Sequence, residues 1–474
     1  MIKRGAEMAR RKSQGDGIPT GRMSRTLPVV QLAARTTGES IVASLRRREP
    51  PPEVYARRAD RYVEVLGRSK GALMKAAQML SVLPVLSTDN PDAQAAFQTA
   101  LTRLQADAPP MAPELAAEMI EQELGAPPSQ IFAEFDMTPL AAASIGQVHL
   151  ARHHDGRALA VKVQYPGVAD AIRSDLRNTE LMSVFFQFLR SVVPLLSRSN
   201  PKALAAEISA RLTEELDYRL EAANQAFFAD AYRGHPFIHV PEVLPELSSS
   251  RVLTQEFADG MLWTDATGAS QQLRNTWGEA VYRFAHGSLR RFGVSNADPN
   301  PGNYVFHDDG TVSFIDFGCV KRFDDAMVAM VREIFRVGLS QDGEALWRLL
   351  VEGGTFDARH GLTPDELFEH FRVRFEVFMN GPQPLTMTPE TLKEILAHEF
   401  SNAGHGGAWL RSVKNTDAWF FYTRIELGVY GVLAGLQSSN EVLAIVREMD
   451  FGDPPGTPLG EADAAFWAAR VGSM

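Results

Sequence analysis

The sequence predicts an α+β fold of two lobes, a small antiparallel sheet followed by a larger helical lobe, with a helical extension in front. Three observations predict this organisation. Apolar residues recur at three- and four-residue steps from about residue 32 to 125, which is typical of amphipathic helices. After Pro127-Pro128 the pattern changes to short β-type runs bounded by turns. Helical periodicity returns after about residue 260 and is interrupted only by residues 294–316.

The small lobe is predicted from strands at 131–137, 146–152 and 158–164, the last two joined by the tight turn His154-Asp155-Gly156. Helices are expected from about 168 to 233, and two short strands follow at 238–243 and 251–257. The last 20 or so residues are rich in Pro, Gly and Ala and are expected to form a loose tail. The chain therefore divides into five parts. They are a basic tail (1–30), a helical extension (31–125), a small lobe (126–260), a large lobe (261–455) and a C-terminal tail (456–474).

Composition restricts the class of protein. The 474 residues are 45% hydrophobic, which is enough for a packed core. The formal net charge of -10 argues against a whole-surface nucleic-acid binder, because phosphate neutralisation needs clustered Lys and Arg, and we expect no nucleic-acid partner. The single cysteine, Cys319, excludes an internal disulfide, favours a reducing compartment and is expected to be a small buried residue.

No segment of the sequence predicts insertion into a membrane. The first 25 residues are rich in Lys and Arg without the apolar stretch of a signal peptide, so this tail is expected to be solvated, with contact to an anionic membrane surface as the alternative. The best candidate span, Trp419 to Leu436, carries Arg424 and Glu426, which are costly at the bilayer centre. We therefore predict a buried helix there, no transmembrane helix, and a cytoplasmic protein that is at most peripheral to the inner membrane.

Residues 296–318 are the most informative part of the chain. Asp298 and Asn303 have the D-x-x-x-x-N spacing of a kinase catalytic loop, and Asp316-Phe317-Gly318 matches its metal-binding triplet. Phosphoryl transfer needs fixed cations, so we expect Asp316 to bind Mg²⁺, with Asn303 adding a neutral oxygen. Asp298 would orient or deprotonate the attacking group. Either piece alone is more typical of a plain loop, but their order and spacing favour a site.

Two upstream segments fit the same chemistry. Lys162 lies on a predicted strand with Val161 and Val163 on the opposite face, as in the strand whose lysine neutralises nucleotide phosphates. The loop that begins with Ala141, Ala142, Ala143 and Ser144 stands where a kinase keeps its glycine-rich phosphate loop. Alanine lacks the freedom of glycine at positive φ, so we expect a stiffer phosphate-binding loop; an ordinary small-residue turn is the alternative.

Two acidic positions are weaker candidates. Asp217 and Glu221 are four residues apart and would share one face of a helix, and Glu221 is the candidate partner of Lys162. A solvated acidic helix face is the alternative. Glu256 ends a predicted strand near the connection between the lobes, where it could contact an adenine ring or be a plain strand-end residue.

Together these segments resemble the UbiB/AarF family of atypical kinases, which is tied to ubiquinone and other isoprenoid-quinone lipids. The resemblance runs from about residue 67 to 322 and is most specific in three segments besides the catalytic ones: Ala141 to Arg152, Val161 to Gly167 and Glu215 to Asn224. It implies a protein-kinase-like fold that binds ATP or ADP with Mg²⁺.

The resemblance also implies a role for a helix in front of the small lobe. Lys75 and Gln78 match the family's K-x-G-Q motif, except that Ala77 replaces the glycine. In the family this helix covers the nucleotide pocket beside an E-x-D pair, here Glu215 and Asp217. The resemblance therefore implies a covered site that disfavours protein substrates.

Two further departures bear on catalysis, because Asn296 and Asn300 stand where the family usually has His. The resemblance implies ATPase or phosphotransferase activity in lipid or quinone metabolism, a lipid or quinone-precursor ligand, peripheral membrane contact and biosynthetic-enzyme partners. Two alternatives stay open. One is a nucleotide-binding pseudokinase scaffold, favoured by the two asparagines, and the other is a small-molecule kinase of the aminoglycoside or choline type.

Overall fold

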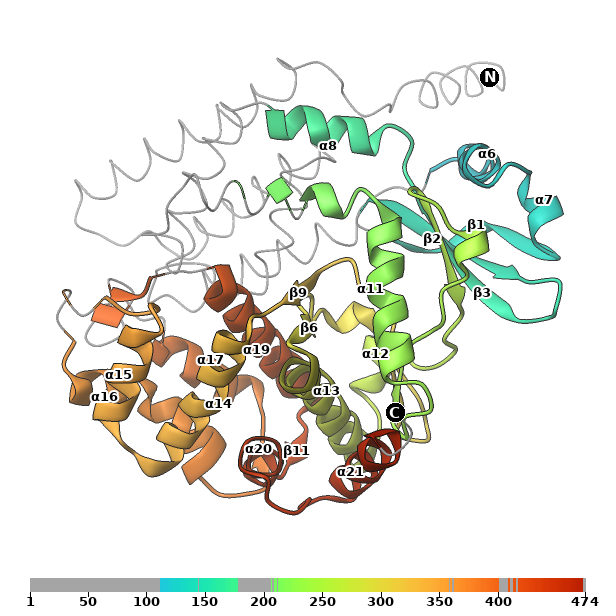
Figure 1. The fold of residues 1–474 in the computed structure, drawn as a ribbon. Coiled ribbons are helices and arrows are strands. Elements are labelled where there is room, and N and C mark those ends of the chain that lie inside the picture. The colour runs from blue at the N-terminus through green and yellow to red at the C-terminus, as the bar shows by residue number, and fades with distance from the viewer. Residues whose placement is uncertain are drawn as a thin grey trace, which may run out of the picture.

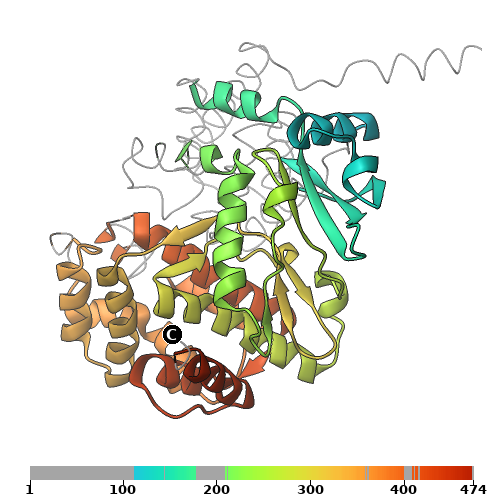
Figure 2. The same cartoon turned by 45° about the vertical axis from the view of Figure 1, so that its right-hand side comes forward.

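The computed structural model describes residues 111–471 except 144, 178–205, 207–208, 211, 358, 360–361, 400–407, 410–411 and 415–416. Within this part, a small sheet lobe lies above a larger helical lobe, with helix α11 between them (Figures 1 and 2). The predicted two-lobed α+β fold is confirmed. The predicted helical extension up to residue 110, with Lys75 and Gln78, and the loop residue Ser144 lie outside the described residues.

The small lobe contains an antiparallel sheet of order β1-β2-β3-β5. Its strands are Glu134–Ala142, Gly146–Arg152, Ala158–Gln164 and Val252–Glu256. The first strand begins three residues later than predicted, because residues Pro128–Ile131 form the short helix α7 after the prolines. The predicted tight turn joins β2 to β3, with Gly156 at φ 93°.

Alternation along β3 decides which side chains face the site. Val161 and Val163 are fully buried on one face, where they pack with helix α6, Pro113–Leu124. Lys162 points the other way and pairs with Val148 of β2 and Leu253 of β5. The sheet thus holds Lys162 from both sides by backbone hydrogen bonds.

Helix α11, Tyr218–Ala231, starts later than the sequence suggested. The side chain of Asp217 accepts a hydrogen bond from the backbone N–H of Arg219 and is the N-cap. A short carboxylate satisfies free N–H groups at a helix start better than it fits a helix interior. The expectation that Asp217 and Glu221 share a helix face is therefore wrong.

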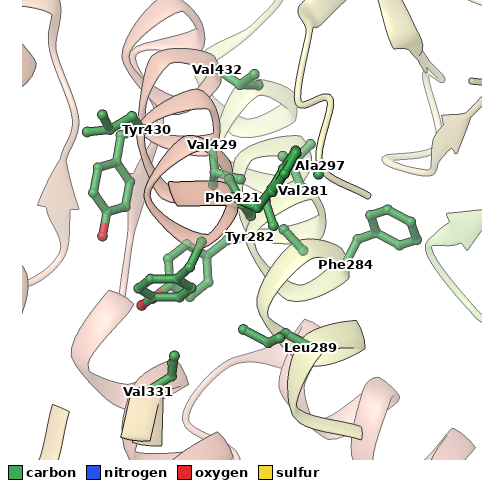
Figure 3. Close-up of a cluster of buried hydrophobic side chains, with 14 of the residues drawn as sticks. Val281, Tyr282, Phe284, Leu289, Ala297, Val331, Phe421, Val429, Tyr430 and Val432 are labelled. Atoms are coloured by element: carbon green, nitrogen blue, oxygen red, sulfur yellow. The ribbon is translucent and has the colours of Figure 1, made fainter. Parts of the chain in front are cut away.

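The large lobe is built around helices α13, Gln271–Phe292, and α19, Asp417–Leu436. Figure 3 shows side chains of both helices meeting in the core, among them Val281 and Phe421. The surrounding helices are α12 Trp263–Ala266, α14 Asp325–Ser340, α15 Gly343–Glu352, α16 Pro364–Phe375, α17 Pro389–Glu399, α20 Val442–Phe451 and α21 Pro458–Val471. Helix α8, Val168–Arg177, follows β3, and the short strands β10 and β11, Leu385–Thr386 and Ser439–Asn440, pair with each other.

Short strands present the catalytic segment between the two lobes. The sheet β4-β8-β7 is formed by Ile238–His239, Val312–Phe314 and Tyr304–Phe306, and β6, Val294–Asn296, pairs with β9, Val320–Arg322. Residues 297–303, which include the 3-10 helix Pro301–Asn303, and residues 315–319 connect these strands. Because both loops leave paired strands, they are held at fixed positions next to each other.

The end of the chain differs from the sequence-based expectation. Residues Pro458–Val471 form helix α21 instead of a loose tail, and Figure 1 shows it against the lower face of the large lobe. Asp463 is buried and accepts hydrogen bonds from His235 and Arg291. Proline at the first helical position and the alanines that follow favour this helix.

The described residues include no helix that is long and apolar enough to cross a membrane. Helix α19 contains the best candidate for a membrane span in the sequence, Trp419 to Leu436. Its Arg424 and Glu426 are each 1% exposed inside the large lobe, which confirms the predicted buried helix.

Candidate functional site

A cavity of about 660 Å³ lies between the lobes. Most of the sequence-predicted site residues that the structure describes line it: Ala141, Ala142, Ala143, Lys162, Glu215, Glu221, Glu256, Asp298, Asn303 and Asp316. Asp217 is not among the lining residues. Segments that are far apart in sequence therefore meet at one cavity.

Lys162 is the centre of the polar wall of this cavity. Its Nζ donates to Glu221 Oε1 and Oε2, at 2.7 and 2.9 Å, and to Asp316 Oδ2 at 3.2 Å. The ammonium also lies 5.0 Å from the ring centroid of Tyr218. The predicted partnership of Lys162 with Glu221 is present, and it extends to the aspartate of the second catalytic loop.

Burial governs the ionisation of this cluster. Burial opposes the charge of Lys162, but the carboxylates of Asp316 and Glu221 outweigh it and raise the lysine pKa well above its ordinary value. Burial raises the pKa of Glu221 to about 7, although Lys162 acts in the opposite direction. Burial also raises the pKa of Tyr218, so its hydroxyl stays protonated. The site thus offers a permanent cation and a neutral donor.

Asp298 is held from two sides. Asn303 Nδ2 donates to Asp298 Oδ2 and to its carbonyl oxygen, both at 3.0 Å. Arg424 Nη2 donates to Asp298 Oδ1 at 2.6 Å. Because the amide nitrogen of Asn303 faces Asp298, its oxygen is the atom that could contact a metal.

Asn296 and Asn300 have local structural roles. Asn296 Nδ2 donates to the carbonyl oxygen of Asp316 at 2.8 Å, and its Oδ1 accepts from the Asp298 N–H at 3.0 Å. Asn300 Oδ1 accepts from the Gly302 N–H at 2.9 Å and caps the short 3-10 helix Pro301–Asn303. Asn296 therefore ties the two catalytic loops together without any need for protonation.

The triplet Asp316-Phe317-Gly318 is anchored by an aromatic side chain. Asp316 Oδ1 accepts from the Gly318 N–H at 3.0 Å. The side chain of Phe317 is fully buried, with its ring centroid 4.9 Å from that of Phe228 and 6.4 Å from that of Phe284. This packing turns the Asp316 carboxylate toward Lys162 and the cavity.

The alanine-rich segment is mostly strand. Ala141 and Ala142 belong to β1, and the Ala143 N–H donates to the Gly146 carbonyl at 2.8 Å to close a tight turn. A Cβ at Gly146 would lie 2.2 Å from the Val163 carbonyl oxygen, so this position requires glycine. The described residues on either side of Ser144 are therefore held in place, with Gly146 paired to Gln164 of β3.

The strand that leads out of the small lobe carries two polar groups. Glu256 lines the cavity, but its Oε2 accepts from the Glu242 N–H at 3.2 Å. Gln255 Nε2 donates to the carbonyl oxygen of Ile315 at 3.2 Å, while its buried Oε1 has no partner. Sequence reasoning did not select Gln255, because a strand glutamine carries no spacing signal.

Arg424 is the other residue that sequence reasoning missed as part of the site. It arrives from α19, 126 residues after Asp298, and lines the cavity. The one available signal was a charged residue within an otherwise apolar helix. In the sequence this charge speaks against a membrane span, and nothing near it in the chain indicates a contact with Asp298.

The residues present fit Mg²⁺, because Asp316 and Asn303 supply hard oxygen donors and both line the cavity. Lys162, 3.2 Å from Asp316, adds positive charge for phosphate oxygens. The arrangement can thus hold a phosphate chain and a cation while Asp298 faces an incoming group.

Comparison with known proteins places these features in a family. The family model described as ABC1 atypical kinase-like domain matches residues 103–350, just over half of the chain. Atypical kinase COQ8B, mitochondrial, of Rattus norvegicus is 32% identical over 346 residues, 70% of this chain and 62% of that protein. ACTIVITY OF BC1 COMPLEX KINASE 7, chloroplastic, of Arabidopsis thaliana is 31% identical over 54% of this chain and 36% of that protein.

The chain thus matches between 36% and 62% of the length of these two relatives. Among solved structures, that of Rv3197 with erythromycin from Mycobacterium tuberculosis matches with a TM-score of 0.61 and 27% identity. This match covers 88% of the present chain and 100% of the other.

Proposed function

Since the chain belongs to the ABC1 atypical kinase-like family, we propose that it binds ATP or ADP with Mg²⁺ in the cavity between the lobes. The contact of Lys162 with Glu221 and Asp316 carries this proposal, because it joins a cation to a candidate metal ligand at hydrogen-bond distance. The base would lie against the apolar lining, including Val148, Leu253 and Ile315.

The chemistry follows from where each side chain sits. Bound Mg²⁺ would neutralise phosphate charge at Asp316 and Asn303. Lys162 would bind the phosphate chain while Glu221 keeps its ammonium in place, and Asp298 would accept the proton of the attacking hydroxyl or water. We therefore propose an ATPase or phosphotransferase.

We extend the proposal to a small lipid-linked or quinone-precursor substrate and to peripheral membrane contact, in support of lipid metabolism. The support is the apolar edge of the cavity, where Leu140 and Leu262 line the wall yet are 56% and 59% exposed. Co-sedimentation with lipid vesicles measures this contact.

A nucleotide-binding scaffold without turnover, serving biosynthetic enzymes, is the second candidate. One observation favours it: Arg424 and Asn303 occupy both carboxylate oxygens of Asp298, which weakens that group as a base. Sustained ATP hydrolysis by the purified protein that is lost in Asp298→Asn would exclude the scaffold reading.

The first test is thermal unfolding with Mg-ATP, Mg-ADP or nucleotide without metal, beside the Asp316→Asn variant. A ligand at 100 times its dissociation constant adds about 2.7 kcal/mol of stability, so the melting temperature should rise clearly. We expect a metal-dependent rise that Asp316→Asn abolishes. No rise with either nucleotide would refute nucleotide binding.

A further inference from the structure

Both oxygens of the Asp316 carboxylate already accept hydrogen bonds from the protein. Oδ1 accepts from the Gly318 N–H at 3.0 Å, and Oδ2 accepts from Lys162 Nζ at 3.2 Å. The Asp316 side chain is 33% exposed and lines the cavity, so a dissolved cation can reach it. A metal ion that approaches Asp316 therefore has to compete with the ammonium of Lys162.

Lys162 is held beside Asp316 by the sheet and by α11. Strand β3 lies between β2 and β5, and both carboxylate oxygens of Glu221 accept from Nζ. The lysine side chain is 14% exposed, and the ring centroid of Tyr218 lies 5.0 Å from Nζ. A divalent cation at Asp316 would thus lie close to a fixed positive charge, and such charges repel each other strongly where little water separates them.

The cavity as a whole attracts cations. Its described lining has two cationic side chains, Lys162 and Arg424, against five carboxylates, which are Glu215, Glu221, Glu256, Asp298 and Asp316. Arg424 contacts Asp298, whereas Lys162 contacts Asp316, the carboxylate that we propose as the metal ligand. A cavity lined mainly by one sign of charge concentrates ions of the opposite sign. The ammonium of Lys162 stands at the carboxylate where such an ion would otherwise bind.

The protein by itself offers few of the ligands that a metal ion needs. In the part of the chain that the structure describes, no three His, Cys, Asp or Glu side chains are grouped so that they could hold a metal ion. Mg²⁺ requires octahedral coordination and is usually bound through one or two carboxylates together with substrate phosphates. Phosphate oxygens of a nucleotide would add to those of Asp316 and Asn303. The same phosphates would attract the ammonium of Lys162 away from Asp316.

We propose that Lys162 keeps dissolved divalent metal away from Asp316, so that a metal ion enters the cavity only together with a nucleotide. This inference rests on the proposed nucleotide function and deepens it. Lys162 exchanges Asp316 for the phosphate chain when the nucleotide binds, while Glu221 holds the ammonium before and after. Metal and nucleotide consequently strengthen each other's binding, since such coupling acts equally in both directions.

The test measures the binding of Mn²⁺, which can replace Mg²⁺ and is detected by electron paramagnetic resonance, without any nucleotide. The unchanged protein should bind Mn²⁺ weakly. Lys162→Met keeps most of the side-chain length without the charge, and it should bind Mn²⁺ at least about tenfold more tightly because the repulsion is removed. Lys162→Gln, a second uncharged variant, should show the same gain. Adding Asp316→Asn to either variant should abolish it.

Lys321→Met is the matched control. Lys321 is also a buried lysine over an aromatic ring, that of Phe421, but it is not among the residues that line the cavity. This variant should bind Mn²⁺ as weakly as the unchanged protein does. Equal Mn²⁺ affinity of the unchanged protein and both uncharged Lys162 variants would overturn the proposed role of Lys162, and so would an equal gain in Lys321→Met.

A second titration repeats the Mn²⁺ measurement on the unchanged protein with ADP present. ADP should tighten the binding of Mn²⁺ by at least about tenfold, because it supplies ligands and draws Lys162 away. The same Mn²⁺ affinity with and without bound ADP would overturn the proposal. No binding of ADP at any Mn²⁺ concentration would overturn the nucleotide function instead, and the gain in Lys162→Met is distinct from that result because it is measured without nucleotide.

Discussion

Lys162 contacts Glu221 and Asp316, which lie 59 and 154 residues away along the chain. Its own strand fixes only the direction of the side chain, and its partners come from a helix and from a loop of the other lobe. Asn296 shows the same principle, because its amide bridges Asp298 and Asp316. At the residue scale, the site therefore consists of long-range polar contacts that each depend on the tertiary fold.

One buried histidine leads to a prediction about pH. His286 is 1% exposed in α13, its ring lies 4.2 Å from that of Tyr282, and its Nε2 has no partner. Burial, and then the nearby Arg290 charge, lower the pKa of His286 well below 6.5. The unfolded chain therefore takes up a proton below pH 6.5 that the folded protein does not, so stability is full above pH 6.5 and falls as the pH drops.

We expect His286→Leu to reduce the slope of unfolding free energy against pH, between about pH 6.5 and 5, by up to about 1.4 kcal/mol per pH unit. Urea unfolding at a series of pH values measures this slope. The exposed His154 provides the control, since His154→Leu should keep the original slope. An unchanged slope in His286→Leu would show that His286 accepts a proton in the folded protein.

At the scale of elements, one face of α11 organises the site. Glu221, Asn224 and Phe228 follow at three- and four-residue steps, which places them on one side of the helix. Glu221 accepts from Lys162, Asn224 donates to the Phe317 carbonyl at 3.3 Å, and Phe228 packs on the Phe317 ring. Helix α11 thereby connects β3, which carries Lys162, to the loop of Asp316 and Phe317.

The packing of Phe317 can be tested directly. Phe317→Ala should lower the free energy of unfolding by about 3–5 kcal/mol, because it leaves a cavity between α11 and α13. Phe317→Leu should cost less than about 1.5 kcal/mol, since most of the volume is kept. Urea unfolding measures the loss in free energy of unfolding of both variants. Equal losses for the two would mean that this ring does not hold the helices together.

At the scale of the whole molecule, the cavity between the lobes has an apolar edge, which includes the exposed side chains of Leu140 and Leu262. The chain as a whole carries a net charge of -10. Exposed leucines beside a cavity are typical of a surface that meets an apolar partner. Leu140 comes from β1, and Leu262 follows the connection between the lobes. They flank one opening only because the lobes are packed together.

If this edge contacts lipid, replacing Leu140 and Leu262 together by Ser should reduce co-sedimentation with neutral phosphatidylcholine vesicles that contain ubiquinone by about tenfold or more. Each buried methylene group contributes about 0.8 kcal/mol, so two leucines suffice for that change. Leu115 and Leu220, exposed by 40% and 47% and not on the cavity wall, provide a matched double variant. Equal binding of both double variants would contradict the proposed lipid contact.

By itself, the sequence determined the fold class, the family resemblance and most of the residues that line the cavity. Local patterns carry this information: strand alternation oriented Lys162, and motif spacing identified Asp298, Asn303 and Asp316. Composition misled at residues 458–471, where Pro and Ala were taken as signs of a loose tail but form a helix, whose Asp463 contacts the distant His235. The N-cap role of Asp217 was missed for a local reason, since a helix start and a helix interior look alike in spacing.

Only the tertiary structure decided which groups complete the site. Gln255 carries no local signal and Arg424 only that of a charge in an apolar helix, because their contacts are with loops 60 and 126 residues away. Whether a buried charge is satisfied or left with free donors is likewise a property of the packed core, since the same arginine would be fully hydrated in an unfolded chain. The sequence names the residues that can do the chemistry, and packing decides which of them are held in position to do it.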